Sequence, residues 1–249
     1  MRVEIWSDIA CPWCYIGKAR FERGLAAFPH RDRVEVVHRS FELDPRRPRG
    51  ATEAVTDMLV AKYGRTPDEA RAMEEHVAAS AHAEGLAYVT AGRDHGNTFD
   101  LHRLLHLAAA RGLGDALLNG LYRANFAEER SVYDPAAALA VAVEAGLDEA
   151  EARAVLADPD AYAAEVRADE REAADLGATA VPFFVLDRRY GISGGQPAEV
   201  FTRALEQAWQ DRADVADPAP EPVADPAPEP VGGPAPECGP DGACEVPRD

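Results

Sequence analysis

Hydrophobic positions near the start of the sequence recur first with the period of a strand and then with that of a helix. Residues 3–7 and 34–43 have the apolar, β-branched composition of strands. The segment 14–28 between them is predicted to be an amphipathic helix, because its apolar residues recur at helical spacing: Ile16, Ala19, Leu25 and Phe28. A connection of this length is a crossover, so the two strands are predicted to be parallel neighbours in one sheet.

A long block of helical periodicity follows the second strand. Seven helices are predicted, over residues 52–63, 67–84, 98–111, 113–127, 134–145, 148–156 and 158–176. Asp134 and Asp158 each stand directly before a proline, a pair typical of a helix N-cap and its first helical residue.

Strand composition returns near residue 180. Residues 182–186 and 190–193 are predicted to form a hairpin, followed by a last helix over 197–212. The order β-α-β, helices, β-β-α predicts an α/β fold in which the outer elements close one small sheet around a helical insertion. The predicted organisation is one domain from residues 1–44 and 178–212, an insertion over 45–177, and a tail over 213–249.

The last 37 residues have a composition unlike the rest of the chain. They contain ten of the 19 prolines and nine of the 44 acidic residues, and the sequence ADPAPEPV occurs twice, over 216–223 and 224–231. Alternating prolines and acids favour an extended chain and cannot supply a hydrophobic core. We therefore expect residues 213–249 to form a disordered tail rich in proline, alanine and acidic residues.

The formal net charge is -18, of which the tail contributes -8 and the first 212 residues -10. A protein this acidic is a poor candidate for binding nucleic acid or an anionic membrane through its overall field. Neither a signal peptide nor an apolar run of about 18 residues is visible, which predicts no membrane span and a cytoplasmic protein. In that compartment paired cysteines are more often catalytic or metal-binding than structural.

Cys11, Pro12, Trp13 and Cys14 stand between the first strand and the first helix. Their spacing lets the two sulfurs meet across one helical turn, with Cys11 at the helix N-terminus, where unpaired N–H groups favour a thiolate. Cysteines in such places have lowered pKa values, so Cys11 is predicted to be the nucleophile and Cys14 the more buried, resolving thiol. The alternatives are an inert pair and a zinc half-site, but no metal is predicted because no second ligand pair stands at a suitable distance.

Val181 and Pro182 open the strand over 182–186. A proline there suits an edge position or a cis peptide bond. A cis-proline loop facing Cys11 would present the Val181 backbone to a bound polypeptide and would keep metal from the thiols. The alternative is an ordinary proline at the start of a strand.

Cys238 and Cys244 form a second cysteine pair in the tail, separated by two turn-forming dipeptides, Gly239-Pro240 and Asp241-Gly242. One interpretation is a relay in which a disulfide of this tail pair exchanges with Cys11. The alternatives are an incidental exposed pair and metal capture.

Five further residues are candidates for roles at the site. Asp8 either accepts the proton of the resolving thiol or closes the strand before it. Asn97 and His102 are expected to line a substrate cleft, because the insertion should overhang the cysteines, although Asn97 is equally suited to cap a helix. Pro12 and Trp13 are expected to contact substrate, the alternative for Trp13 being local packing.

Together these residues resemble the DsbA family of the thioredoxin superfamily, and within it the FrnE-type proteins, which are related to 2-hydroxychromene-2-carboxylate isomerases. The resemblance is carried by residues 7–18, 41–45, 97–98 with 102–104, 181–185 and 193–197. It implies a thioredoxin-like fold with a large all-helical insertion, a cis-proline site at Val181-Pro182, and thiol–disulfide exchange. Some FrnE-type proteins similarly carry a C-terminal cysteine pair.

We therefore predict a cytosolic DsbA-like thiol–disulfide oxidoreductase that acts by mixed-disulfide exchange at Cys11 and Cys14, with no bound cofactor beyond its redox-active disulfide. The related isomerases carry serine at the position of Cys11 and use glutathione, so glutathione is a candidate co-substrate. One alternative is accordingly a glutathione-dependent isomerase or a tailoring enzyme for polyketide-like aromatics, and another is a non-catalytic binding or chaperone module. The predicted partners are protein thiols, protein disulfides or small thiols, with a homodimer left open.

Overall fold

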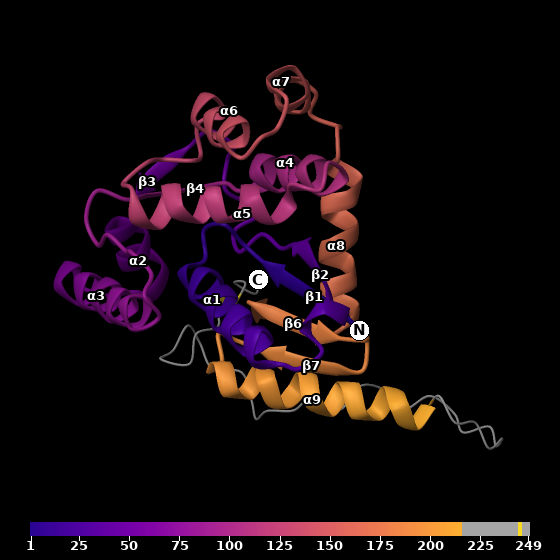
Figure 1. Cartoon of the computed structure of the whole chain (residues 1–249). Coiled ribbons are helices and arrows are strands. Elements are labelled where there is room, and N and C mark those ends of the chain that lie inside the picture. Colours follow the sequence, from indigo (N-terminus) through magenta and orange to yellow (C-terminus); the bar gives the residue numbers. More distant parts are fainter. Residues whose placement is uncertain (216–243, 246–249) are drawn as a thin grey trace.

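The computed structural model describes residues 1–215 and 244–245. Its central sheet has four strands in the order β2-β1-β6-β7, formed by Glu35–Ser40, Arg2–Ser7, Phe183–Leu186 and Tyr190–Ser193 (Figure 1). β1 and β2 are parallel and are joined through α1 (Pro12–Ala27), whereas β6 is antiparallel to both β1 and β7. The predicted β-α-β unit and hairpin are therefore confirmed, although β2 ends at Ser40 and not at residue 43.

The two faces of the sheet are covered differently because side chains alternate along each strand. On one face the strands pack against α1 and α9 (Ala198–Val215) through a cluster that includes Val3, Ile5, Phe21, Phe184 and Phe201. The opposite face carries Trp6 and is covered by α8 (Ala163–Asp175). The Trp6 indole donates a 2.8 Å hydrogen bond to the carbonyl of Asp169, which ties this helix to the sheet.

The chain between β2 and β5 (Ala180–Val181) is mainly helical, as predicted. Its helices are α2 (Val55–Tyr63), α3 (Pro67–Ala83), α4 (Phe99–Ala110), α5 (Gly114–Tyr122) with a π-helical turn over Arg123–Ala127, α6 (Pro135–Glu144), α7 (Glu149–Ala157) and α8. The insertion is nevertheless not all-helical, because β3 (Thr52–Ala54), predicted as the start of a helix, pairs antiparallel with β4 (Asp94–Gly96). This two-stranded ribbon contacts α2, which begins directly after β3.

The start of α8 also differs from the prediction. Asp158 is the C-cap of α7 and does not begin the next helix, which starts after Tyr162 in the left-handed conformation with φ of 58°. The reason lies in Arg103, a buried side chain of α4. Its guanidinium donates hydrogen bonds to the carbonyls of Val155, Asp158 and Ala161, which holds the intervening segment as a turn.

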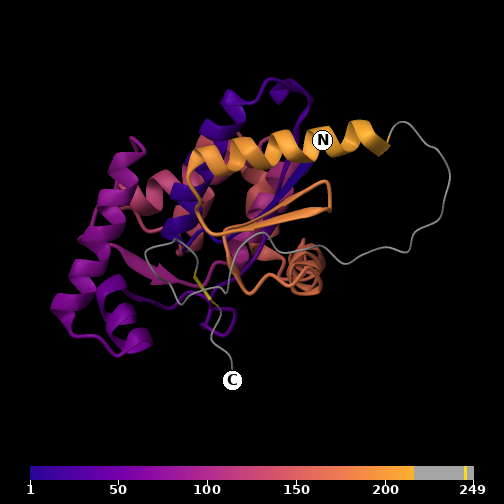
Figure 2. The same cartoon turned by 90° about the horizontal axis from the view of Figure 1, so that it is seen from below.

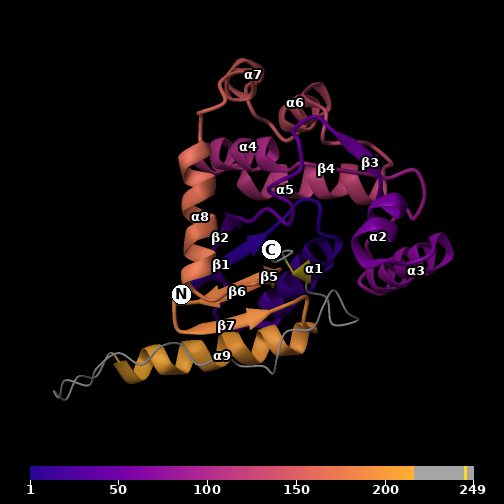
Figure 3. The ribbon, with the colours of Figure 1, turned by 180° about the vertical axis from the view of Figure 1, so that it is seen from behind.

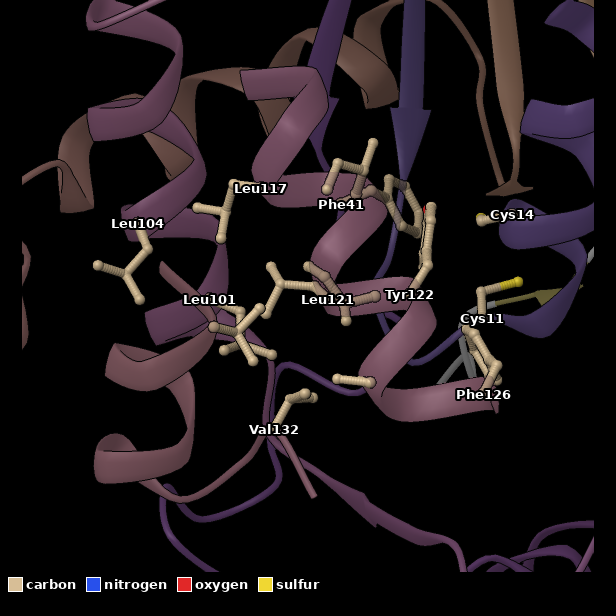
Figure 4. Packing of buried hydrophobic residues seen from close by; sticks show 14 of the residues in the cluster. Cys11, Cys14, Phe41, Leu101, Leu104, Leu117, Leu121, Tyr122, Phe126 and Val132 are labelled. Atoms are coloured by element: carbon tan, nitrogen blue, oxygen red, sulfur yellow. The ribbon is translucent and has the colours of Figure 1, made fainter. Parts of the chain in front are cut away.

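A single hydrophobic cluster connects the sheet and α1 to the helices of the insertion. It contains residues of α4 and α5 such as Leu101, Leu104, Leu117 and Leu121, together with Cys11 and Cys14. Figure 4 shows these leucines to one side of the two cysteines, with Tyr122 between the two groups. The insertion therefore forms one wall around the cysteine pair.

The structure contains one strand within the segment predicted to be a disordered tail. Residues Cys244–Glu245 (β8) pair antiparallel with Ala180–Val181 (β5), as the short yellow strand in Figure 3 shows. The other residues of the predicted tail from 216 onward lie outside the described residues. In the part of the chain that is described, no helix is long and apolar enough to cross a membrane.

Candidate active site

The cysteine pair, Cys11 and Cys14, lies after the end of β1, at the first turn of α1. Cys11 is the N-cap residue of α1 and Pro12 the first helical residue, and the backbone N–H of Cys14 donates a 3.1 Å hydrogen bond to the Cys11 carbonyl. The cysteines are thus one helical turn apart, at the helix end where backbone N–H groups lack intrahelical partners. Both side chains are buried, with exposed fractions of 0% for Cys11 and 1% for Cys14, so Cys14 is not the more buried of the two.

The strand that follows the insertion brings the Val181 backbone to the cysteine pair. The Val181–Pro182 peptide bond is cis, one of the two predicted alternatives, and the Cys11 thiol donates a 3.7 Å hydrogen bond to the Val181 carbonyl. The loops can approach this closely because residue 17 is glycine. A Cβ at Gly17 would lie 2.9 Å from Cγ of Pro182 and 3.1 Å from Cα of Gly195.

The environment of Cys14 favours its protonated form. Burial raises the pKa of the Cys14 thiol well above its ordinary value, and the neighbouring Cys11 sulfur acts in the same direction. Asp8 has two smaller, opposing effects, since its backbone hydrogen-bonds the sulfur while its charge repels a thiolate. A thiol that stays protonated suits a group that waits to resolve a mixed disulfide.

A buried ion pair lies next to the cysteine pair. The Asp8 carboxylate accepts a 2.7 Å hydrogen bond from the Leu43 N–H and lies 3.4 Å from Nε2 of His102, and both side chains are 1% exposed. Burial by itself would raise the pKa of Asp8, but the His102 ring and the Leu43 N–H outweigh it and hold that pKa below its usual range. Burial by itself would lower the pKa of His102, but the Asp8 carboxylate outweighs it and raises that pKa.

The two residues expected to line a cleft occupy other places. His102 is enclosed beside Asp8. The Asn97 amide donates a 3.1 Å hydrogen bond to the Arg47 carbonyl, and its Oδ1 accepts a 3.0 Å hydrogen bond from the N–H of Phe99 at the start of α4. Asn97 therefore makes the helix-capping contact that was the alternative to a place in the cleft.

A cavity of about 1030 Å³ opens beside Pro12 and Trp13, which are the predicted substrate contacts. Helices α2 and α3 and the β3–β4 ribbon supply its other walls. Its apolar lining consists mainly of Val55, Met58, Leu59, Met73 and Val77. Its charged lining is mixed: the cations are Arg47, Lys62, Arg65 and Arg93, and the carboxylates are Asp44, Glu53, Glu69, Glu74 and Asp94. Trp13 is 5% exposed, so it is a largely buried side chain in the wall of this cavity.

The cavity-lining residues of the insertion were not predicted from the sequence. The usable signals were weak: Lys62 is one of two lysines in a chain with 24 arginines, and Met58 and Met73 are two of its three methionines. Desolvation lowers the pKa of Lys62, while the Cys11 and Asp44 side chains act in the opposite direction. The Lys62 ammonium group is therefore within electrostatic range of the Cys11 sulfur.

Among the described residues no group of three or more His, Cys, Asp or Glu side chains could hold a metal ion. Of the tail pair, Cys244 lies in β8 and Cys238 lies outside the described residues. The relay predicted for these cysteines therefore stays a prediction at this point.

Comparison with known proteins gives a consistent result. Residues 2–206 match the family model described as the DSBA-like thioredoxin domain. The fold superposes on the crystal structure of a probable DsbA oxidoreductase from Streptomyces coelicolor with a TM-score of 0.83 and 63% identity, and 100% of each chain is covered. An uncharacterized protein of Bacillus subtilis, YwbO, is 25% identical over 205 residues, which cover 82% of this chain and 96% of YwbO.

Two more distant structures share the fold. The cytosolic disulfide reductase DsbM from Pseudomonas aeruginosa has a TM-score of 0.59 and 20% identity, covering 84% of this chain and 99% of DsbM. A 2-hydroxychromene-2-carboxylate isomerase has a TM-score of 0.58 and 13% identity, covering 87% of this chain and 100% of the isomerase. At these identities the likeness shows the fold alone. The thioredoxin-like fold and the resemblance to DsbA proteins predicted from the sequence are confirmed.

Proposed function

The chain belongs to the DSBA-like thioredoxin domain family, and on that premise we propose that it is a thiol–disulfide oxidoreductase acting through Cys11 and Cys14. The observation that carries the proposal is the placement of Cys11. It caps the N-terminus of α1, its sulfur contacts the Val181 carbonyl, and Cys14 lies one turn further into the helix. Unpaired N–H groups at a helix N-terminus stabilise negative charge on a sulfur held there.

The exchange proceeds through a mixed disulfide. In the reducing direction Cys11 attacks a substrate disulfide, bonds to one substrate sulfur and releases the other as a thiolate. Cys14 then attacks the sulfur of Cys11, which frees the second substrate thiol and leaves a Cys11–Cys14 disulfide. The oxidising direction consists of the same steps in reverse.

Cys14 must lose its proton before it attacks, because its pKa is raised. We assign that proton to Asp8, whose carboxylate the His102 ring holds in the ionised form. The ionised carboxylate is an available but weak acceptor, and the transfer becomes less unfavourable in the mixed disulfide, where the charge of Cys11 no longer raises the pKa of Cys14. His102 is thus a positioning residue, and its proposed role replaces the substrate contact expected from the sequence.

The cavity beside Trp13 supports a small thiol co-substrate in addition to protein substrates. Its apolar wall and the cationic Lys62 match a thiol that carries carboxylates, such as glutathione, whereas Arg47 is already paired with Asp44 and Glu53. DsbM, a fold relative, has a structure with GSH, and it is described as cytosolic, which supports a cytoplasmic role for this chain as well. The same cavity is the observation that favours the second candidate function, isomerisation or tailoring of a small aromatic substrate.

Insulin reduction and oxidative refolding of a reduced protein test the proposal. Wild type should be active in both assays, whereas Cys11→Ser and Cys14→Ser should each lose turnover, because one removes the nucleophile and the other the resolving thiol. Full activity of Cys11→Ser in both assays would show that the proposed function is wrong. Conversion of a glutathione-dependent small substrate by Cys14→Ser, without disulfide exchange, would favour the second candidate.

A further inference from the structure

A buried tyrosine of the insertion lies against the cysteine pair and has no role in the exchange described above. Tyr122 is the last residue of α5 and is 1% exposed. Its ring lies between the leucines of the insertion and Cys14 (Figure 4). Burial raises the pKa of the Tyr122 hydroxyl well above its ordinary value, and the charge of Cys14 acts in the same direction. The hydroxyl is therefore within electrostatic range of the Cys14 sulfur.

The two ends of α5 lie along α1. At the start of α5, Asp115 forms a 2.8 Å ion pair with Lys18, which stands four residues after Cys14 in α1. At the other end, Tyr122 lies beside Cys14 itself. Figure 1 shows α5 above α1 and α9 below it, and in Figure 2, seen from below, α9 is nearest the viewer. Tyr122 therefore approaches the cysteine pair from the side of α1 that faces away from α9.

The turn that follows Tyr122 is unusual. Arg123–Ala127 is π-helical, and such turns are frequent at functional sites. Within it the buried side chain of Asn125 donates a 3.1 Å hydrogen bond to the carbonyl of Ile9, in the loop before Cys11. The insertion and the cysteine loop are thus tied together directly after Tyr122.

The Tyr122 hydroxyl has no hydrogen-bond partner among the residues that the structure describes. The Ser7 hydroxyl is near enough to affect the pKa of Tyr122 but forms no aligned hydrogen bond with it. Leaving a buried polar group unpaired costs free energy, so an unpaired hydroxyl in a folded protein calls for an explanation. Because its pKa is raised, this hydroxyl keeps its proton and remains a donor.

The Cys14 sulfur changes its capacity to accept a hydrogen bond during the exchange. A protonated thiol is a weak acceptor, whereas hydrogen bonds to an ionised group are shorter and stronger. The ionised neighbours Cys11 and Asp8 disfavour a Cys14 thiolate, and the backbone of Asp8 supplies one hydrogen bond that favours it. A second donor, placed in advance where the charge develops, would lower the barrier to forming this thiolate.

We propose that the Tyr122 hydroxyl donates a hydrogen bond to the Cys14 thiolate whenever that thiolate forms. The proposal deepens the proposed function and rests on it, because it requires Cys14 to react. In the reducing direction the thiolate forms when Cys14 loses its proton, and it is consumed when Cys14 attacks the sulfur of Cys11. In the oxidising direction a substrate thiolate attacks Cys11, the Cys11–Cys14 bond breaks, and Cys14 leaves as the thiolate. Tyr122 keeps its proton throughout, so it exchanges no atom or electron with the cysteines.

Tyr122→Phe removes only the hydroxyl and tests the proposal on the full chain, with Cys238 and Cys244 changed to serine in every protein. Stopped-flow tryptophan fluorescence follows reduction of the Cys11–Cys14 disulfide by dithiothreitol and its formation by oxidised dithiothreitol. Both rates should fall about tenfold, the effect expected for the loss of one hydrogen bond to a charged group. Their ratio should stay the same, because the hydrogen bond exists in neither the disulfide nor the protonated dithiol.

Tyr15→Phe is the matched control. The Tyr15 ring belongs to the same aromatic cluster, with its centroid 5.6 Å from that of Tyr122, but its hydroxyl donates a 3.4 Å hydrogen bond to the Ala87 carbonyl. Its rates should match those of the parent protein. Tyr122→Phe should not lower Tm, because a buried hydroxyl without a partner does not stabilise the fold.

The outcomes separate this proposal from the proposed function. Unchanged rates for Tyr122→Phe, or an equal loss in Tyr15→Phe, would overturn the role of Tyr122 and leave the oxidoreductase proposal standing. A lower Tm or an altered ratio of the two rates would also overturn it, because the hydroxyl would then support the resting fold. If the parent protein exchanges with neither form of dithiothreitol while circular dichroism shows it folded, both proposals are refuted.

Discussion

Replacing His102 with glutamine should destabilise the protein in a pH-dependent way. Removing one partner of a buried ion pair costs about 3–5 kcal/mol. The 3.4 Å contact between His102 and Asp8 is not an aligned hydrogen bond, so we expect the lower end, about 3 kcal/mol. In a chain of this size that loss lowers Tm by about 6–12 °C.

The sign of the pH dependence follows from the two pKa shifts. The pKa of His102 is raised in the folded protein, so its contribution is complete below the ordinary histidine pKa of about 6.5 and is lost as the pH rises through the raised value. The pKa of Asp8 is lowered, so its contribution is present above about pH 4 and is lost as the pH falls. The loss caused by His102→Gln should therefore be larger at pH 6 than at pH 9.

Urea denaturation under reducing conditions at pH 6 and pH 9 measures this difference. His82→Gln is the matched control, because His82 is an exposed residue of α3 and its replacement should change the free energy of unfolding by no more than about 0.5 kcal/mol. An equal loss for His102→Gln at both pH values, or no loss at pH 6, would refute the buried ion pair.

Three further variants test other parts of the site. Asp8→Asn should lower the pKa of Cys14, because it removes a charge that disfavours the thiolate. Thiolate absorbance in a Cys11→Ser background measures this pKa, and an unchanged or higher value would contradict the prediction. Gly17→Ala should lower the free energy of unfolding by about 1–3 kcal/mol and slow disulfide exchange, because the new Cβ would lie 2.9 Å from Pro182. Denaturation curves measure the first effect and insulin reduction the second. Wild-type values in both would count against the close approach of residue 17 to Pro182. Lys62→Gln should raise KM several-fold for an anionic small disulfide but not for neutral hydroxyethyl disulfide. Equal effects on both would argue against a charge contact between Lys62 and the substrate.

Local patterns in the sequence were sufficient to predict the elements that carry the cysteine pair. The spacing of Cys11 and Cys14 before an amphipathic helix, and Pro182 at the start of a strand, depend on neighbouring residues only. The main chemistry and the sheet could therefore be predicted without tertiary information. The ends of helices were less predictable where hydrogen bonds from a distant side chain fix them. Arg103 has this effect on the turn before α8.

Long-range contacts explain what the sequence did not reveal. His102 has the spacing of a helix-face residue, but α4 lies inside the hydrophobic cluster, so the ring is buried against Asp8, 94 positions earlier in the chain. The cavity lining comes from residues that are separated in sequence, such as Arg47, Lys62 and His95. β8 has only two residues, too few for any periodicity, in a segment whose composition predicts disorder.

The central claim is that Cys11 forms a mixed disulfide with substrate that Cys14 resolves. The most direct measurement is mass spectrometry of Cys14→Ser after reaction with a peptide disulfide, with the tail cysteines changed to serine to leave Cys11 alone. We expect a one-to-one adduct at Cys11 that a reductant removes, and no stable adduct when Cys14 is present. Absence of an adduct at Cys11 in folded protein, or an equally stable adduct with Cys14 in place, would contradict it.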